Sequence, residues 1–257
     1  MTGGAHSAEA ADGVSIAYRR VDGPNPVLLV HGFGSDGEHT WQPTGWIDAL
    51  TRAGRGAILP DLRGHGLSGK PHAASAYRLR AMAADLGAVL DDAGLAQADV
   101  IGYSMGSQVA RALARDAPGR IGRLVLGGIG PVEQFRAWGV EAVRAVLLEG
   151  ARSAEHRGPS ATGVDILHAA LDAPGADPQA LAACAEGVAS DVLLVGSMPV
   201  PTMLIVGGSD PVTDGAGGFA RRLHASFVSI PGRTHLTALG SLAFKRAALD
   251  FLATSTE

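Results

Sequence analysis

Residues 99–116 read DVIGYSMGSQVARALARD, and this stretch decides the fold. The apolar run at its start is typical of a buried strand, and residues 106–116 have the composition of a helix. Between them lies GYSMG, residues 102–106, a G-x-S-x-G motif at the turn from strand to helix. A serine at such a turn takes a strained backbone and projects its hydroxyl from the sheet. We therefore predict that Ser104 is a nucleophile.

A serine hydroxyl needs a neutral imidazole to take its proton, and a carboxylate to hold that imidazole in the right tautomer. Asp210 lies in GGSDPVT, just past the apolar run PTMLIV, and His235 lies in IPGRTHL, past the last apolar run. Both positions follow predicted strands, and the order Ser104, Asp210, His235 is the order associated with this serine turn. These three residues are the predicted catalytic set.

Rivals exist for two of these positions. Asp214 lies four residues after Asp210 and is expected in the next loop or helix, so Asp210 is preferred as the acid. The chain has nine histidines, and only His235 combines the chain order with a position after a strand. The rivals weighed against it are His6, His72, His156, His168 and His224.

A tetrahedral intermediate carries a developing oxyanion, which is usually stabilised by two backbone N–H groups. One is expected from Met105, the residue after the nucleophile. The other is expected from Phe33 in the loop HGFG that follows the apolar run PVLLVH. His31, at the start of this loop, is interpreted as a structural residue that fixes the loop by hydrogen bonding.

Short apolar runs alternate with helical stretches along the chain, which predicts an α/β fold with a mostly parallel central sheet flanked by helices. The expected strands are residues 14–21, 26–31, 57–60, 99–103, 123–127, 203–207 and 227–230. The expected helices are residues 46–53, 79–93, 106–116, 219–224 and 238–253.

Residues 131–198 break this alternation, because they hold helical patches and no convincing strand. We predict a small helical lid there, inserted between two parts of one core, residues 1–130 and 199–257. An insertion at this place would overhang the carboxyl ends of the strands, where open α/β sheets bind ligands. Four apolar lid residues are expected either to line a substrate pocket or to form the lid's own core: Phe135, Trp138, Val143 and Leu147.

Composition narrows the function classes. The net charge of −4 is spread without a basic run, so we expect no nucleic-acid partner. No window approaches the roughly 20 apolar residues of a membrane span, and the N-terminus lacks the layout of a signal peptide, so a cytoplasmic protein is expected. A lone cysteine, Cys184, excludes an internal disulfide and is interpreted as a small buried residue.

Neither a metal nor a cofactor is expected. The histidines and acids lack spacings such as H-E-x-x-H. The segment GGIG, residues 127–130, lacks the full dinucleotide fingerprint.

Five segments together resemble the α/β-hydrolase superfamily: HGFG, DLRGHGLSG, GYSMG, GGSDPV and PGRTH. The resemblance covers nearly the whole chain outside the lid. It implies a chiefly structural role for residues 61–69, so no catalytic role is carried over to Asp61, Arg63 or His65. It also implies that a serine nucleophile argues against the dehalogenase and epoxide hydrolase branches, which would have an aspartate. The short lid gives little support to a lipase acting on long acyl chains.

The leading hypothesis is a hydrolase of a small or medium carboxylic ester, lactone or thioester that works through an acyl-enzyme. Similar motifs occur in carbon-carbon bond hydrolases of vinylogous diketones and in the metal-free haloperoxidase or perhydrolase group, which remain alternatives. A small-molecule receptor that retains the fold is the non-enzyme alternative. The expected partner is a small ester-like molecule, and the sequence leaves the oligomeric state open.

Overall fold

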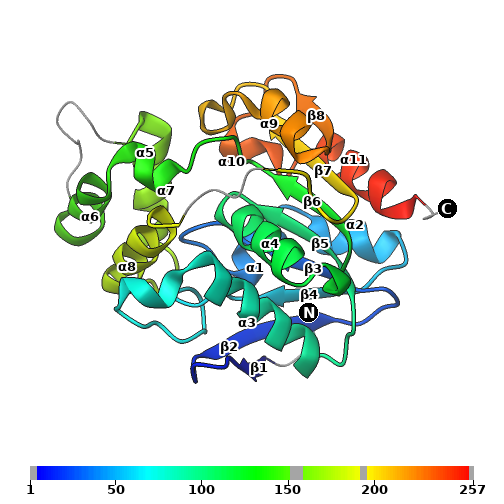
Figure 1. The fold of residues 1–257 in the computed structure, drawn as a ribbon, viewed down its shortest axis with the longest axis horizontal. Coiled ribbons are helices and arrows are strands. Elements are labelled where there is room, and N and C mark those ends of the chain that lie inside the picture. Colours follow the sequence, from blue (N-terminus) through cyan, green and yellow to red (C-terminus); the bar gives the residue numbers. More distant parts are fainter. Residues whose placement is uncertain (1–4, 151–158, 192–195, 255–257) are drawn as a thin grey trace.

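The computed structural model describes residues 5–150, 159–191 and 196–254. Its centre is an eight-stranded sheet in the order β1-β2-β4-β3-β5-β6-β7-β8 (Figure 1). The pairs β1–β2 and β2–β4 are antiparallel, and the remaining pairs are parallel. The strands are β1 His6–Glu9, β2 Ser15–Val21, β3 Val27–Val30, β4 Ala57–Pro60, β5 Ala98–Tyr103, β6 Ile121–Gly127, β7 Thr202–Gly207 and β8 Ser226–Ile230.

Helices cover both faces of this sheet. The helices α3 (Leu79–Asp92), α4 (Met105–Asp116) and α9 (Ala216–Leu223) pack on one face. The opposite face is covered by α1 (Gly37–Trp41), α2 (Trp46–Arg52) and α11 (Leu242–Ala253). Four short helical turns lie in the connections around the sheet: η1 Ala74–Tyr77, η2 Pro118–Arg120, η3 Pro211–Thr213 and α10 His235–Ala238.

Alternation along the strands produces two separate hydrophobic cores. In β3, Leu28 and Val30 pack with the core on the α3–α4 side, whereas Val27 and Leu29 pack with the core on the α2–α11 side. All four side chains are fully buried. A continuous apolar run is therefore what a strand covered on both faces requires, as the sequence pattern indicated.

The predicted α/β architecture is confirmed, with differences at three places. The sequence pattern missed β1, an exposed edge strand that contains His6 and in which only Ala8 is buried. It also missed the five-residue helix α1. The expected helix 238–253 is two helices, because the chain turns at Gly240 and Ser241 then caps α11.

The segment between β6 and β7 contains helices and no strand among its described residues. Its helices are α5 Gln134–Trp138, α6 Val140–Glu149, α7 Ala161–Leu171 and α8 Pro178–Ala189. They gather beside the sheet, at the left of Figure 1. In the part of the chain that the structure describes, no helix combines the length and the apolar character needed to cross a membrane.

The loop of residues 61–69 is held by a buried ion pair. The Arg63 guanidinium donates to both carboxylate oxygens of Asp85 on α3, at 2.6 Å each, and both side chains are 1% exposed. It also donates to the half-exposed Asp12 and to the carbonyl of Ala76. All five N–H donors of Arg63 are thus used, and they fix the loop.

Asp85→Ala is expected to lower the free energy of unfolding by about 3–5 kcal/mol, because it leaves the buried Arg63 charge without its main partner. Asp12→Ala removes a half-exposed partner of the same guanidinium and is expected to cost about 1 kcal/mol or less. Urea unfolding of both variants measures the difference. Equal losses would show that burial does not determine the strength of these two pairs.

Candidate active site

Ser104 lies between β5 and α4, at the edge of the sheet where the parallel strands end. Its backbone has φ 52° and ψ −123°, and its N–H donates to the carbonyl of Gly127 at 2.8 Å. A positive φ is rare for a residue with a side chain and is characteristic of strained functional positions. The turn exposes the hydroxyl of Ser104 at the carboxyl ends of the strands.

The two glycines of the motif are required by close backbone contacts. A Cβ on Gly106 would lie 2.3 Å from the carbonyl oxygens of Val30 and His31, and a Cβ on Gly102 would lie 2.6 Å from the carbonyl oxygen of Gly106. Both distances are too short for any side chain. The first turn of α4 therefore lies directly against β3, which brings the HGFG loop beside Ser104.

A chain of two hydrogen bonds joins the three predicted catalytic side chains. His235 Nε2 lies 3.0 Å from Ser104 Oγ, and His235 Nδ1 lies 2.8 Å from Asp210 Oδ2. The side chains of His235 and Asp210 are 4% and 0% exposed. Ser104, which precedes the other two residues by more than 100 positions, is thereby held with them in the geometry of a nucleophile, a base and an orienting acid.

The structure places Asp210, not Asp214, beside the histidine. Asp210 ends the turn after β7, and its second carboxylate oxygen accepts the N–H of Val212 at 2.9 Å. Asp214 lies beyond the short helix η3 and is exposed. Of the other histidines, His72 pairs with Asp177, His224 ends α9, and His156 lies outside the described residues.

Two backbone N–H groups near Ser104 have no acceptor among the described residues, those of Phe33 and Met105. Met105 is the first residue of α4, so its N–H has no partner within the helix. The HGFG loop contacts Ser104 directly, because a Cβ on Gly32 would lie 3.3 Å from the Ser104 Cβ. Both unpaired donors thus belong to segments that adjoin the hydroxyl.

His31 fixes this loop. The ring is fully buried, its Nε2 accepts the N–H of Leu62 at 2.9 Å, and its Nδ1 lies 2.7 Å from the carbonyl of Gly32. Burial lowers the pKa of His31, which favours the neutral ring that these two bonds require. His65 stacks edge-on against His31 and Phe33, and burial lowers its pKa to about 3.

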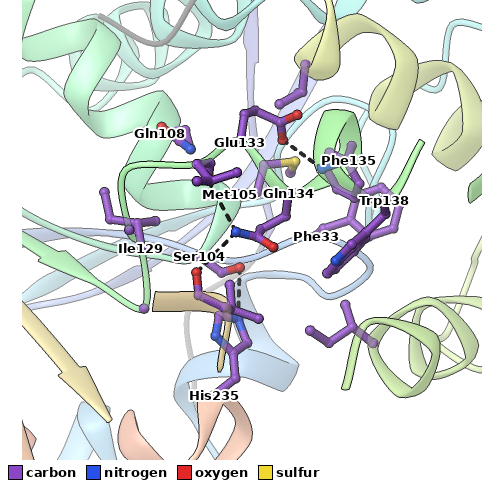
Figure 2. A pocket seen from close by; sticks show the side chains of 16 residues that line it. Phe33, Ser104, Met105, Gln108, Ile129, Glu133, Gln134, Phe135, Trp138 and His235 are labelled. Atoms are coloured by element: carbon purple, nitrogen blue, oxygen red, sulfur yellow. Dashed lines mark hydrogen bonds between the residues drawn. The ribbon is translucent and has the colours of Figure 1, made fainter. Parts of the chain in front are cut away.

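Two cavities meet at Ser104, and both also contact Phe33, Ile166 and His235. One, the more enclosed of the two, is a small cavity of about 40 Å³ beneath the helical segment (Figure 2). It is lined by Phe33, Ser104, Met105, Gln108, Gly128, Ile129, Gly130, Val132, Glu133, Gln134, Phe135, Trp138, Ile166, Val188, Val212 and His235. The other is a more open groove of about 260 Å³ that also contacts Leu236 and Leu239.

The lid residues named from the sequence separate into two groups. Phe135 and Trp138 line the enclosed cavity, and their rings pack edge-on against each other. Leu147 and Val143 do not line it, in keeping with the second of the two alternatives for these lid residues. Both lie on α6, where they are buried in the hydrophobic core among the helices of the insertion. The apolar side of α6 packs against the neighbouring helices and does not face the cavity.

Sequence reasoning missed the polar residues of the enclosed cavity. Glu133 is buried, and its carboxylate accepts the N–H groups of Phe135 and Arg136, which caps α5. Burial raises the pKa of Glu133. Gln108 lies in the first turn of α4, four positions after Ser104, and this spacing was the available signal for it.

The cysteine and the acidic groups add no further chemistry to the site. Cys184 is fully buried against Met105, and burial raises the pKa of its thiol, so the reactive thiolate is disfavoured. Among the described residues, no three His, Cys, Asp or Glu side chains cluster in a way that could hold a metal ion.

A family profile described as alpha/beta hydrolase fold matches residues 25–148. The chain is 36% identical over 162 residues to a dihydrolipoyllysine-residue acetyltransferase component of the acetoin cleaving system of Cupriavidus necator, with 62% of this chain and 39% of the relative covered. It is 33% identical over 133 residues to a 2-hydroxy-6-oxo-2,4-heptadienoate hydrolase of Pseudomonas putida, with 52% and 48% covered. The chain thus spans less than half the length of these relatives.

Solved structures match over nearly the whole chain. A hydrolase from Pseudomonas aeruginosa has a TM-score of 0.75 and 28% identity, with 99% of this chain and 100% of that chain covered. A thermophilic esterase from Thermogutta terrifontis has a TM-score of 0.74 and 25% identity, with 98% of each chain covered. The bottromycin epimerase BotH also matches, at a TM-score of 0.75 and 26% identity, with 97% and 99% covered. Similar folds therefore carry different reactions, and the site has to decide between them.

Proposed function

Because this chain belongs to the α/β-hydrolase superfamily, we propose that it is a serine hydrolase of small or medium carboxylic esters that works through an acyl-enzyme. The observation that carries this proposal is the hydrogen-bonded chain from Ser104 through His235 to Asp210, placed where two cavities meet. Lactones and thioesters contain the same kind of acyl carbon and belong to the same proposal.

In the first half of the reaction, His235 Nε2 accepts the proton of Ser104 as Oγ attacks the carbonyl carbon of the ester. The N–H groups of Phe33 and Met105 stabilise the oxyanion that forms. Asp210 holds the Nδ1–H of His235 and stabilises the imidazolium. The imidazolium then gives its proton to the leaving oxygen, the bond from carbon to that oxygen breaks, and the alcohol departs.

In the second half, His235 takes a proton from a water molecule, whose oxygen attacks the acyl carbon of the ester on Ser104. A second oxyanion forms at the same two N–H groups. It collapses as the bond from carbon to Ser104 Oγ breaks and His235 returns the proton to Oγ. The carboxylic acid leaves, and Ser104 is restored.

The two cavities suit the two halves of an ester. The alcohol has to leave first, so it needs the open groove beside Leu236 and Leu239. The acyl group stays on Ser104 until water arrives, and the enclosed cavity beneath Phe135 and Trp138 shields it meanwhile. The small volume of that cavity favours short acyl chains.

Carbon-carbon bond hydrolysis is the second candidate, because the Pseudomonas putida relative is named for a dienoate substrate. Such a substrate carries a carboxylate, which usually binds to arginine or lysine. Among the described lining residues of both cavities there is no lysine or arginine, and the enclosed one holds the carboxylate of Glu133. This charge pattern favours a neutral ester.

We expect hydrolysis of p-nitrophenyl acetate and butanoate, with kcat/KM at least about tenfold lower for the octanoate, because burying several more methylenes needs space that the cavity lacks. Release of p-nitrophenol measures the rates, and intact mass after rapid quenching detects the acyl group on the protein. A folded protein that cleaves a 2-hydroxy-6-oxo-dienoate and none of these esters would establish the second candidate. Tight ligand binding without turnover of either substrate would establish the receptor alternative.

A further inference from the structure

The side-chain amide of Gln108 lines the enclosed cavity and has no part in the mechanism described above. The residue is 7% exposed and lines the cavity, on the side away from His235 in the view of Figure 2. Its Oε1 is buried and has no hydrogen-bond partner among the described residues. A buried acceptor without a donor is unfavourable, so such a group in a native protein calls for an explanation.

The neighbouring polar groups are already used within the protein. Both carboxylate oxygens of Glu133 accept backbone N–H groups of α5. The amide nitrogen of Gln134 donates to the carbonyls of Val132 and Val212. Gln108 differs from both, because its side chain lines the cavity but makes no hydrogen bond among the described residues.

We propose that Gln108 binds a hydroxyl group on the acyl part of the substrate, so that the substrate is an ester of a neutral hydroxy acid. This inference rests on the proposed esterase function. A hydroxyl donates to Oε1 and also accepts from the amide nitrogen, so it pairs with either end of the amide. A carboxylate has no proton to donate to Oε1, and it would be repelled by Glu133. A methyl or methylene group would leave the acceptor unpaired.

The helix geometry sets the place of this hydroxyl on the acyl chain. Ser104 immediately precedes α4 and Gln108 lies four positions later in its first turn, which corresponds to a rise of about 6 Å along the helix axis. Helical side chains lean toward the N-terminus, so the amide of Gln108 reaches back toward the acyl carbon held on Ser104. A hydroxyl on the third or fourth carbon of the acyl chain fits this separation.

The test uses pairs of ethyl esters in which a hydroxyl replaces a methyl group of the same size. The pairs are 3-hydroxybutanoate with 3-methylbutanoate and 4-hydroxypentanoate with 4-methylpentanoate. For each pair, the ratio of kcat/KM for the hydroxy ester to that for the methyl ester is measured by acid release. The ratio for wild type is then divided by the ratio for Gln108→Met, a variant that keeps the length of the side chain but lacks the amide. This quotient cancels the intrinsic reactivity of the esters, because the same two esters are used with both proteins.

We expect this quotient to be at least about tenfold for one of the two pairs, because a site built to hydrogen-bond a hydroxyl rejects the analogue that lacks it. Gln134→Met is the matched control, the same substitution at the other amide of the cavity, whose nitrogen already donates two hydrogen bonds within the protein, and it should keep the wild-type ratio. A quotient near one for both pairs, with all four esters hydrolysed, would overturn the role of Gln108 alone. A folded wild type that hydrolyses none of the four esters would overturn the proposed function and this inference with it.

Discussion

Replacement of Ser104 by alanine is expected to lower kcat for short p-nitrophenyl esters by about 10⁴- to 10⁶-fold, because no other group can form the acyl-enzyme. The same change should abolish labelling of the protein by a fluorophosphonate, which reacts with activated serines. The fold should survive, because Ser104 lies at a turn and its side chain bonds only to His235 among the described residues.

Labelling is read by intact mass on wild type, Ser104→Ala and Ser209→Ala. Ser209 is an exposed serine next to Asp210, and its replacement should leave both labelling and turnover near the wild-type level. Labelling that persists in Ser104→Ala would mean that another residue is the nucleophile. A folded wild type that takes up no label would show that Ser104 is not activated, and the receptor alternative would then lead.

Asp210→Asn is expected to lower kcat by about 10⁴-fold, since an amide in place of the carboxylate favours the wrong tautomer of His235 and no longer stabilises its charged form. Substrate affinity should change far less, because Asp210 lies behind the histidine. Asp214→Asn, at an exposed carboxylate beyond η3, should change kcat by no more than about twofold.

Steady-state kinetics on both aspartate variants decides whether Asp210 or Asp214 is the acid. Thermal unfolding checks that both variants keep the fold. The side chain of Asp210 also accepts the N–H of Val212, a bond that the asparagine oxygen can keep. A large loss in Asp214→Asn with a mild effect of Asp210→Asn would reverse the assignment of the acid.

The sequence by itself determined the fold class and predicted which side chains would meet at the ends of the strands. Continuous apolar runs such as residues 27–30 identified buried parallel strands, because such strands meet apolar side chains on both faces. The motif around Ser104 required a strand, a sharp turn and a helix, and Gly102 and Gly106 are needed there by backbone contacts that any chain with this turn must make. His235 and Asp210 were found by their positions after strands.

Only the tertiary structure decided which side chains contact one another or line the same cavity. The position of Asp210 directly after a strand favoured it over Asp214, but the hydrogen bond from His235 to Asp210 depends on the path of the turn and is shown only by the structure. Leu147 and Trp138 are both apolar lid residues, but α6 turns one into the core and α5 turns the other toward the cavity. Gln108 can be singled out only from the structure, which shows that its Oε1 has no hydrogen-bond donor among the described residues. These distinctions depend on contacts between segments far apart in the chain, and a local pattern contains no information about them.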